Sequence, residues 1–188
     1  VSFAMKEMSE GELLQLEKAR LLNITEDVYY EIIRQKTASL LASCCAIGAS
    51  SSGSENGTVE KMREFGEKVG MAFQIKDDLF DFGTDEIGKP LGIDIKEKKM
   101  TLPLIKALDT ASWSERRRIR SIMRSDKKSK KNVQEVIDFV KNSGGLEYAQ
   151  KVMQKFYDEA MAILDSFEDS VYKQSLGQLV QFTIERNK

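Results

Sequence analysis

The apolar residues of this chain recur mainly three and four positions apart, which is the spacing of one face of an α-helix. Leu13, Leu16 and Leu21 are spaced for one such face, and they predict a helix up to about residue 20. No segment shows the sustained alternation of apolar and polar residues that is typical of a β-strand. Only two prolines and twelve glycines interrupt the pattern, so we expect an all-α fold of seven or eight helices.

Capping residues and breakers predict where these helices begin and end. Thr25 precedes two acidic residues and is a good N-cap for a helix that runs to about residue 48. Thr58 is expected to cap the next helix, which ends near residue 83, and Ser112 with Glu115 forms a capping box. The remaining segments are helices at about 102–108, 132–142, 146–165 and 170–186, and an extended loop at 84–100.

The stretch FQIKDDLFDF, at 73–82, places three aspartates among apolar residues. When the helix expected over 59–82 is drawn at about 100° per residue, its polar residues fall on one strip between two apolar flanks. The strip contains Gly70, Gln74, Asp77, Asp78 and Asp81. Converging carboxylates raise one another's pKa unless a cation neutralises them. The strip therefore predicts a magnesium site that lines a cavity, and the alternative is a solvated acidic face at the end of a helix.

Lys36 falls in the middle of the apolar stripe of the helix expected over 26–47. A lysine in such a place is costly unless it meets an anion, so Lys36 is a candidate for binding a phosphate group. The alternative is that its long stem carries the ammonium group to the rim. Thr37 offers a hydroxyl beside it, and the expected loop adds three more lysines: Lys89, Lys98 and Lys99. Magnesium and lysines from separate elements together suggest an enzyme that acts on diphosphate esters.

Composition narrows the classes of function further. With 41% apolar and 31% charged residues and a net charge of -1, the chain has the composition of an ordinary globular protein. It has no histidine, which excludes histidine-ligated zinc and Ser-His triads within the chain. Cys44 and Cys45 are neighbours on a helix and cannot bridge each other, so we expect reduced thiols and a cytoplasmic location. No segment approaches the roughly 18 consecutive apolar residues of a transmembrane helix.

The motifs resemble, in order and along nearly the whole chain, those of the trans-isoprenyl diphosphate synthases, or polyprenyl synthetase family. GELLQL (11–16) is similar to the family's GE..Q helix, and KTASLLASCCAIGA (36–49) is similar to its KT..L segment. FQIKDDLFDF resembles its second aspartate-rich motif. GKPLGIDIKEKKMTLPLI (88–105) resembles its GK.....D...GK.T.P loop, although Lys98 stands where the family usually has glycine.

This resemblance implies a helical bundle of the isoprenoid synthase type that condenses isopentenyl diphosphate with an allylic diphosphate. The departing diphosphate itself takes the proton in that reaction, which agrees with the absence of histidine. By this resemblance, the magnesium ligands are Asp77, Asp78 and Asp81, directly or through water. Lys36 and Lys89 bind the allylic diphosphate with help from Lys99. Thr37 and Gln74 stabilise the developing cation with their oxygens, and Phe73 borders the isopentenyl pocket.

The resemblance also implies that residues 1–188 are the C-terminal portion of a single domain. The first aspartate-rich motif, the basic residues for isopentenyl diphosphate and the determinants of chain length are then expected upstream. We therefore expect the chain alone to be inactive and the full-length protein to be a homodimer. A non-catalytic helical partner subunit of a heteromeric synthase remains the alternative.

Two further classes are disfavoured by the sequence. A terpene cyclase would show an N..S...E pattern in place of the residues around Gln74 to Asp81. Nucleic-acid binding could use residues 115–131, where nine arginines and lysines face only Glu115 and Asp126. That segment has no interleaved aromatic residues for stacking on bases, so a solvated basic helix and turn is the better interpretation and no nucleic-acid partner is expected.

Overall fold

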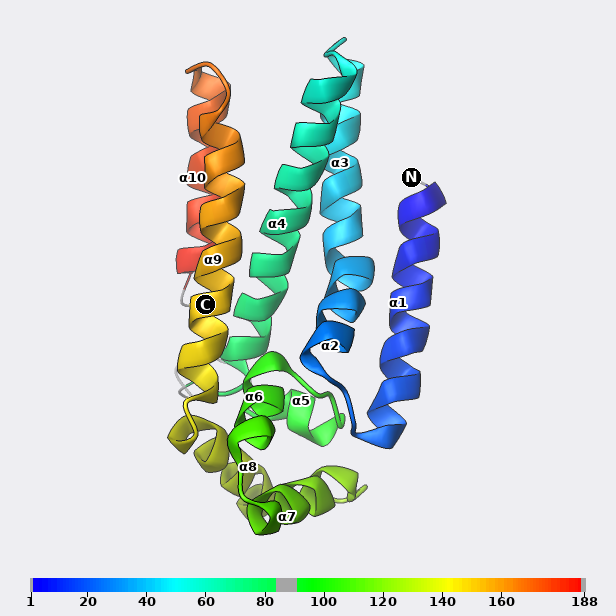
Figure 1. Ribbon diagram of the computed structural model, residues 1–188, viewed down its shortest axis with the longest axis vertical. Coiled ribbons are helices and arrows are strands. Elements are labelled where there is room, and N and C mark those ends of the chain that lie inside the picture. Colours follow the sequence, from blue (N-terminus) through cyan, green and yellow to red (C-terminus); the bar gives the residue numbers. More distant parts are fainter. Residues whose placement is uncertain (1, 84–90, 187–188) are drawn as a thin grey trace.

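The computed structural model describes residues 2–83 and 91–186, and all regular structure within these ranges is helical (Figure 1). The expected all-α fold is confirmed. The elements in chain order are α1 (Ser2–Leu21), α2 (Glu26–Ile33), the π-helical segment η1 (Arg34–Ala38), α3 (Ser39–Ser51), α4 (Asn56–Phe80), α5 (Ile93–Lys96), α6 (Leu102–Thr110), α7 (Trp113–Arg124), α8 (Lys130–Asn142), α9 (Gly145–Asp165) and α10 (Val171–Glu185).

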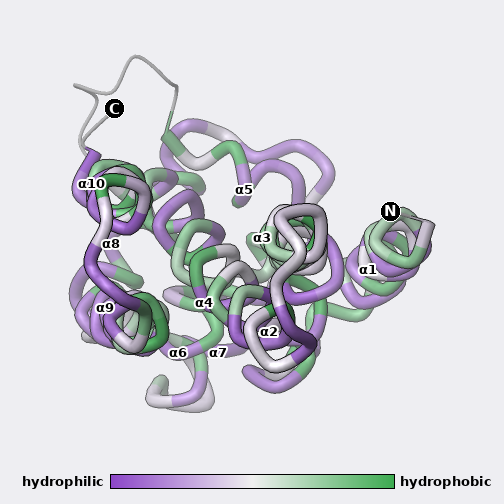
Figure 2. The backbone as a smooth tube through the Cα atoms, turned by 90° about the horizontal axis from the view of Figure 1, so that it is seen from above, coloured by the Kyte–Doolittle hydropathy of each residue, from purple (hydrophilic) through white to green (hydrophobic). Residues whose placement is uncertain are grey.

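The long helices run side by side, and the short ones gather at one end of the molecule. Figure 1 shows α1, α3, α4, α9 and α10 along the long axis, with α5, α6, α7 and α8 at their lower end. Helix α4 is central because it packs against α3 on one side and against α9 on the other, as the view from above shows (Figure 2). No helix in the described ranges is long and apolar enough to cross a membrane.

The apolar flanks of α4 are buried in two hydrophobic clusters. The larger cluster encloses the second half of α4 and includes Ile75, Phe82, Leu102 and Leu104, none of which exposes more than 1% of its surface. The smaller cluster joins the first half of α4 to α9 and α10. Burial on both sides fixes the rotation of α4 about its axis, and this rotation decides which of its polar side chains face the interior.

Two glycines let α4 approach its neighbours closely. A Cβ atom on Gly70 would lie 2.5 Å from the Cα atom of Ala38, and one on Gly66 would lie 2.6 Å from the carbonyl oxygen of Leu41. Such distances are too short for a side chain, so the glycines allow backbone to meet backbone. The contact at Gly70 places η1 directly beside the last turns of α4.

The structure corrects several expected element boundaries. The caps at Thr25 and Ser112 are confirmed. The predicted cap at Thr58 is wrong, because α4 begins at Asn56 and Thr58 lies within it. The helix expected as one regular element from residue 26 is interrupted by η1. The segment expected as an extended loop contains the short helix α5. Gly92, which precedes α5, has a left-handed backbone conformation (φ 72°), and α5 buries Ile95.

Candidate functional site

A pocket of about 230 Å³ lies between α1, α2, η1, α4 and the segment that follows α5. Five of the predicted site residues line it: Lys36, Thr37, Gln74, Asp77 and Lys99. Its other walls are largely apolar and include Ala19, Ile24, Ile32, Ile33 and Met100. Apolar walls with a few convergent polar groups are typical of small-molecule sites.

The segment η1 presents Lys36 and Thr37 to this pocket. A π-helical turn is rare and is frequently found at functional sites. Arg34 holds the segment in place, because its guanidinium donates to Glu31 over 2.8 Å and to Glu7 of α1 over 3.0 Å. The hydrogen bonds from Arg34 also lower the pKa of Glu31, so this anchoring pair stays charged.

Thr37 and Gln74 contact each other across the junction between η1 and α4. The Thr37 hydroxyl donates to the Oε1 atom of Gln74 over 2.7 Å, and the Nε2 atom of Gln74 donates to Oδ1 of Asp78 over 3.0 Å. A hydroxyl has one hydrogen and two lone pairs. Because Thr37 uses its hydrogen on Gln74, its oxygen can present a lone pair to the pocket.

Asp78 is fully buried and is held by donors from three elements. Besides the bond from Gln74, it accepts a hydrogen bond from the Tyr29 hydroxyl over 2.8 Å and one from Lys99 Nζ over 2.7 Å. Burial, and then the charge of Asp78, raise the pKa of Tyr29, so the phenol keeps its proton and remains a donor. Asp78 therefore faces the protein interior, where it orients Lys99 and Gln74.

Lys99 lies between two carboxylates. Its Nζ atom is also 3.4 Å from Oδ2 of Asp94. Burial alone lowers the pKa of Lys99, but the charges of Asp78 and Asp94 outweigh burial and raise it, so the ammonium group stays charged. Burial raises the pKa of Asp94 to about 7; Lys99 opposes this effect, while Asp78 and Asp81 add to it.

Asp77 lies on the exposed side of α4, near the end of α10. Its Oδ1 atom is 3.8 Å from Nη2 of Arg186, and the Arg186 guanidinium lies over the rings of Phe73 at 5.0 Å and Phe80 at 5.5 Å. Phe73 is thus placed beside Arg186 and is not among the residues that line the pocket.

Asp81 points toward α5. Its Oδ1 atom accepts a hydrogen bond from the backbone N–H of Ile93 over 2.7 Å, and burial raises its pKa. Its Oδ2 atom is buried and has no hydrogen-bond partner among the described residues. Asp77, Asp78 and Asp81 therefore point in different directions. In the part of the chain that the structure describes, no three acidic side chains lie close enough to hold a metal ion together.

The predicted lysines have separate surroundings. Lys36 Nζ lies 2.7 Å from Oε2 of Glu12 and 2.9 Å from Oε1 of Gln15, so it turns toward α1 at the edge of the pocket. Lys89 lies outside the described residues. Lys98 has a left-handed backbone (φ 61°), the conformation that favours the glycine of the family pattern, and it forms an ion pair with Asp126.

Three residues of this site were missed by the sequence reasoning: Tyr29, Asp94 and Arg186. Asp94 could have been suspected, because it is a lone acid between Ile93 and Ile95 in a segment that must bury its isoleucines. Tyr29 lies on the predicted apolar stripe, where a phenol packs like any aromatic ring. Nothing in the local sequence separates Arg186 from an ordinary arginine at the end of a helix.

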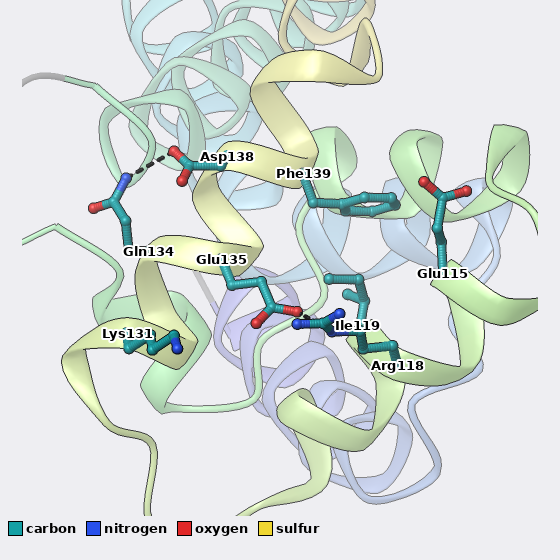
Figure 3. Close-up of a pocket in the computed structure, with 8 residues that line it drawn as sticks. All are labelled: Glu115, Arg118, Ile119, Lys131, Gln134, Glu135, Asp138 and Phe139. Atoms are coloured by element: carbon teal, nitrogen blue, oxygen red, sulfur yellow. Dashed lines mark hydrogen bonds and ion pairs between the residues drawn. The ribbon is translucent and has the colours of Figure 1, made fainter.

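A second, larger cavity of about 550 Å³ lies between α7 and α8, and its lining residues are drawn in Figure 3. Arg118 is paired with Glu135, and Gln134 donates to Asp138 over 2.8 Å. The cavity contains none of the predicted site residues. Four of its polar side chains bind one another in these two pairs, so we do not regard it as the candidate active site.

Comparison with known proteins places the chain in a family. The polyprenyl synthetase family profile matches residues 1–140, and the chain belongs to this family. It is 37% identical to the short chain isoprenyl diphosphate synthase of Methanothermobacter thermautotrophicus over 94% of this chain and 54% of that protein. It is 30% identical to the octaprenyl diphosphate synthase of Escherichia coli over 100% of this chain and 58% of that protein.

Solved structures show the same fold. A decaprenyl diphosphate synthase from Rhodobacter capsulatus superposes with a TM-score of 0.91 at 33% identity, over 98% of this chain and 57% of that one. A polyprenyl synthase from Caulobacter crescentus, complexed with calcium and isoprenyl diphosphate, superposes with a TM-score of 0.91 at 32% identity. The match covers 98% of this chain and 57% of that one. The expected resemblance is confirmed, and the chain spans about half the length of the relatives that it matches.

Proposed function

We propose that this chain forms part of a trans-prenyltransferase that condenses isopentenyl diphosphate with an allylic diphosphate to give a longer trans-polyprenyl diphosphate. The observation that carries the proposal is the pocket that Lys36, Thr37, Gln74, Asp77 and Lys99 line together with apolar walls. Cationic and polar groups suit a diphosphate, and the apolar walls suit a hydrocarbon chain. The names of the family and its relatives agree with this reaction.

Lys36 and Lys89 would bind the allylic diphosphate, and Lys99, which lines the pocket together with Lys36, would assist them. Lys99 is held in place by Asp78, so its charge is already oriented and needs no rearrangement when diphosphate charge develops. Lys36 is paired with Glu12, whose side chain is 50% exposed, and a diphosphate would compete with this exposed partner.

We propose magnesium as the cofactor, with Asp77, Asp78 and Asp81 as its ligands, directly or through water. Magnesium prefers oxygen ligands and keeps several waters. The exposed carboxylate of Asp77 and the unpartnered Oδ2 atom of Asp81 fit this requirement. Asp78 is fully buried and bonded to Tyr29, Gln74 and Lys99, so it would reach the metal only through water while it holds Lys99 in place. When bound, magnesium would neutralise diphosphate charge and make the diphosphate a better leaving group.

The developing allylic cation would be stabilised by the oxygen atoms of Thr37 and Gln74, which already lie 2.7 Å apart. The apolar wall of Ile32, Ile33 and Met100 would exclude water that could otherwise capture the cation. Phe73 is proposed to border the isopentenyl pocket, and the Arg186 guanidinium over its ring places a positive charge beside that border.

We further propose that residues 1–188 form the C-terminal portion of one domain, that the chain alone has no prenyl transfer activity, and that the active protein is a cytoplasmic homodimer. The fraction of its relatives' length that the chain spans supports the first two points. Apolar side chains on α1 are exposed, such as Leu13 at 66% and Leu16 at 56%. Their exposure supports the proposal that another protein surface covers α1 in the active protein. The free thiols Cys44 and Cys45 are compatible with a reducing compartment.

Calorimetric titration of the chain with an allylic diphosphate, with magnesium and with EDTA, tests the site. We expect binding that depends on magnesium, is weakened by Lys36→Gln, and loses its magnesium dependence in Asp77→Asn. Lys155→Gln, which removes an exposed charge on α9, is the matched control and should bind as the wild type does. Equal binding by all variants would contradict the proposed site. Transfer of a radiolabelled isopentenyl group by the chain alone would contradict the proposed inactivity.

A further inference from the structure

One segment of this chain carries a large excess of basic over acidic residues. Residues 113–131 carry nine arginines and lysines but only two acidic residues, a local charge of +7 in a chain whose net charge is -1. The other residues therefore carry -8 together. This segment forms α7, the turn after it and the start of α8, and Figure 1 shows α7 lying across one end of the molecule.

One face of α7 combines an exposed tryptophan with arginines. At about 100° per residue, Trp113, Arg117 and Arg124 fall within an arc of about 40°. We call these three residues the basic stripe; Arg120 lies beside it but is only partly exposed, and its Nε atom is buried. Trp113 is 74% exposed, whereas Ile119 and Met123, on another side of the helix, are 3% and 0% exposed. The stripe therefore points away from the core and runs for about 17 Å along the helix.

The basic residues next to the stripe already have structural partners. Arg116 donates to the carbonyl oxygens of Leu108, over 2.9 Å, and Asp109, over 3.1 Å, and so caps the end of α6. Arg118 lies on another side of α7, where it pairs with Glu135 of α8 (Figure 3). Both residues therefore already have partners within the protein, although the Arg118 side chain is 71% exposed.

The stripe itself lacks such partners. Arg117 lies over the ring of Trp113, with 5.3 Å between the guanidinium carbon and the ring centroid. Within residues 2–83 and 91–186, Arg117 and Arg124 form no ion pair with a carboxylate. Three exposed lysines, Lys127, Lys130 and Lys131, continue the positive charge beyond the end of α7. The stripe thus presents one exposed tryptophan at the start of α7, followed along the helix by arginines that form no ion pair with a carboxylate of the described residues.

An anionic membrane surface fits this arrangement better than a nucleic acid does. A single-stranded nucleic acid needs a basic groove and several aromatic platforms, but the pocket that Trp113 and Arg117 line contains no second aromatic residue and includes the acidic Glu135. A membrane surface would meet only the outer face of α7. Tryptophan is enriched at the lipid–water interface, and basic side chains are attracted to anionic headgroups. We propose that the basic stripe docks the protein on membranes that contain anionic phospholipids.

Trp113 is the one tryptophan in the sequence, so its fluorescence reports directly on this surface. The protein is titrated with vesicles of phosphatidylcholine mixed with phosphatidylserine, and with vesicles of phosphatidylcholine alone. We expect a blue shift of the Trp113 emission and co-sedimentation with the mixed vesicles only, both reversed by high salt. Each cation near an anionic surface contributes about a fivefold factor, so Arg117→Gln/Arg124→Gln should weaken binding roughly 25-fold.

The control variant is Lys6→Gln/Lys155→Gln, which removes the same charge from side chains that are 70% and 73% exposed on α1 and α9. It should bind as the wild type does, and circular dichroism melting should show that both double variants are folded. The proposal is overturned if the protein sediments equally with charged and neutral vesicles, or if both double variants lose binding equally. It is also overturned if duplex DNA displaces the protein from the mixed vesicles at physiological salt, which would favour a nucleic-acid partner.

Discussion

Lys99 and Asp78 form an ion pair in which the Nζ and Oδ1 atoms are 2.7 Å apart, and the aspartate is fully buried. The pair connects the segment after α5 to the inner face of α4. The lysine side chain is only 20% exposed, so solvent does little to replace either partner when the other is removed.

Removing Lys99 should therefore destabilise the fold strongly. We expect Lys99→Met to lower the free energy of unfolding by about 3 kcal/mol, because a buried carboxylate is left without its counter-charge. Lys99→Met/Asp78→Asn removes both charges and should recover part of this loss. Urea unfolding followed by circular dichroism measures both values. A double variant that is less stable than Lys99→Met would show that the unpaired charge is not the cause.

Asp94 should make stability depend on pH. Its pKa is raised by burial from an ordinary value of 3.8 to about 7, so the folded protein holds this proton more tightly than the unfolded chain does. The resulting stabilisation is complete below about pH 4 and is lost as the pH rises through about 7. In EDTA, the stability of Asp94→Asn relative to the wild type should therefore increase from pH 5 to pH 8. A constant difference in the free energy of unfolding would contradict the raised pKa.

Glycine should suit the backbone at position 98 better than a residue with a side chain does. Its φ of 61° is unfavourable for a residue with a side chain, by about 1 kcal/mol. Lys98→Gly relieves this strain but removes the exposed ion pair with Asp126, whereas Lys98→Ala removes the ion pair and keeps the strain. We expect Lys98→Gly to be more stable than Lys98→Ala by about 1 kcal/mol in thermal unfolding. Equal stability of the two variants would show that the backbone is not strained at this position.

Gly70 and Gly48 provide a matched pair of helical glycines. A methyl group on Gly70 would overlap the backbone of Ala38, so Gly70→Ala should destabilise the fold by about 2 kcal/mol. Gly48 has no atom within 4 Å of the added methyl, and Gly48→Ala should stabilise the fold by about 0.5 kcal/mol because alanine favours a helix. Opposite shifts in the melting temperature are expected, and shifts of the same sign would contradict the close contact of η1 with α4.

The local sequence was sufficient to predict most helices, because their caps and breakers act over a few residues. Thr25 and Ser112 cap their helices through hydrogen bonds to the third residue that follows. The π-helical segment was not predicted, since a helical wheel assumes a constant rotation per residue. The short helix α5 was missed for a different reason. It depends on a left-handed Gly92 packed against Val133, a contact between residues far apart in the sequence.

The candidate site was predicted in its composition but not in its orientation. A wheel places the neighbours Asp77 and Asp78 on one polar strip, but only packing decides that Asp78 enters the interior while Asp77 stays exposed. The roles of Tyr29 and Asp94 around Lys99 were not predicted either, because they arise where three separate elements meet. The roles of the predicted residues in catalysis remain predictions.

Thr37, Gln74, Asp78 and Lys99 form one continuous chain of hydrogen bonds that passes through η1, α4 and the segment after α5. Each member fixes the orientation of the next, so these four side chains cannot vary independently. Single substitutions along the chain will therefore have non-additive effects, and double-mutant cycles are needed to divide the free energy among them. A change in the preferred substrate of such a pocket would require coordinated substitutions at several of these positions.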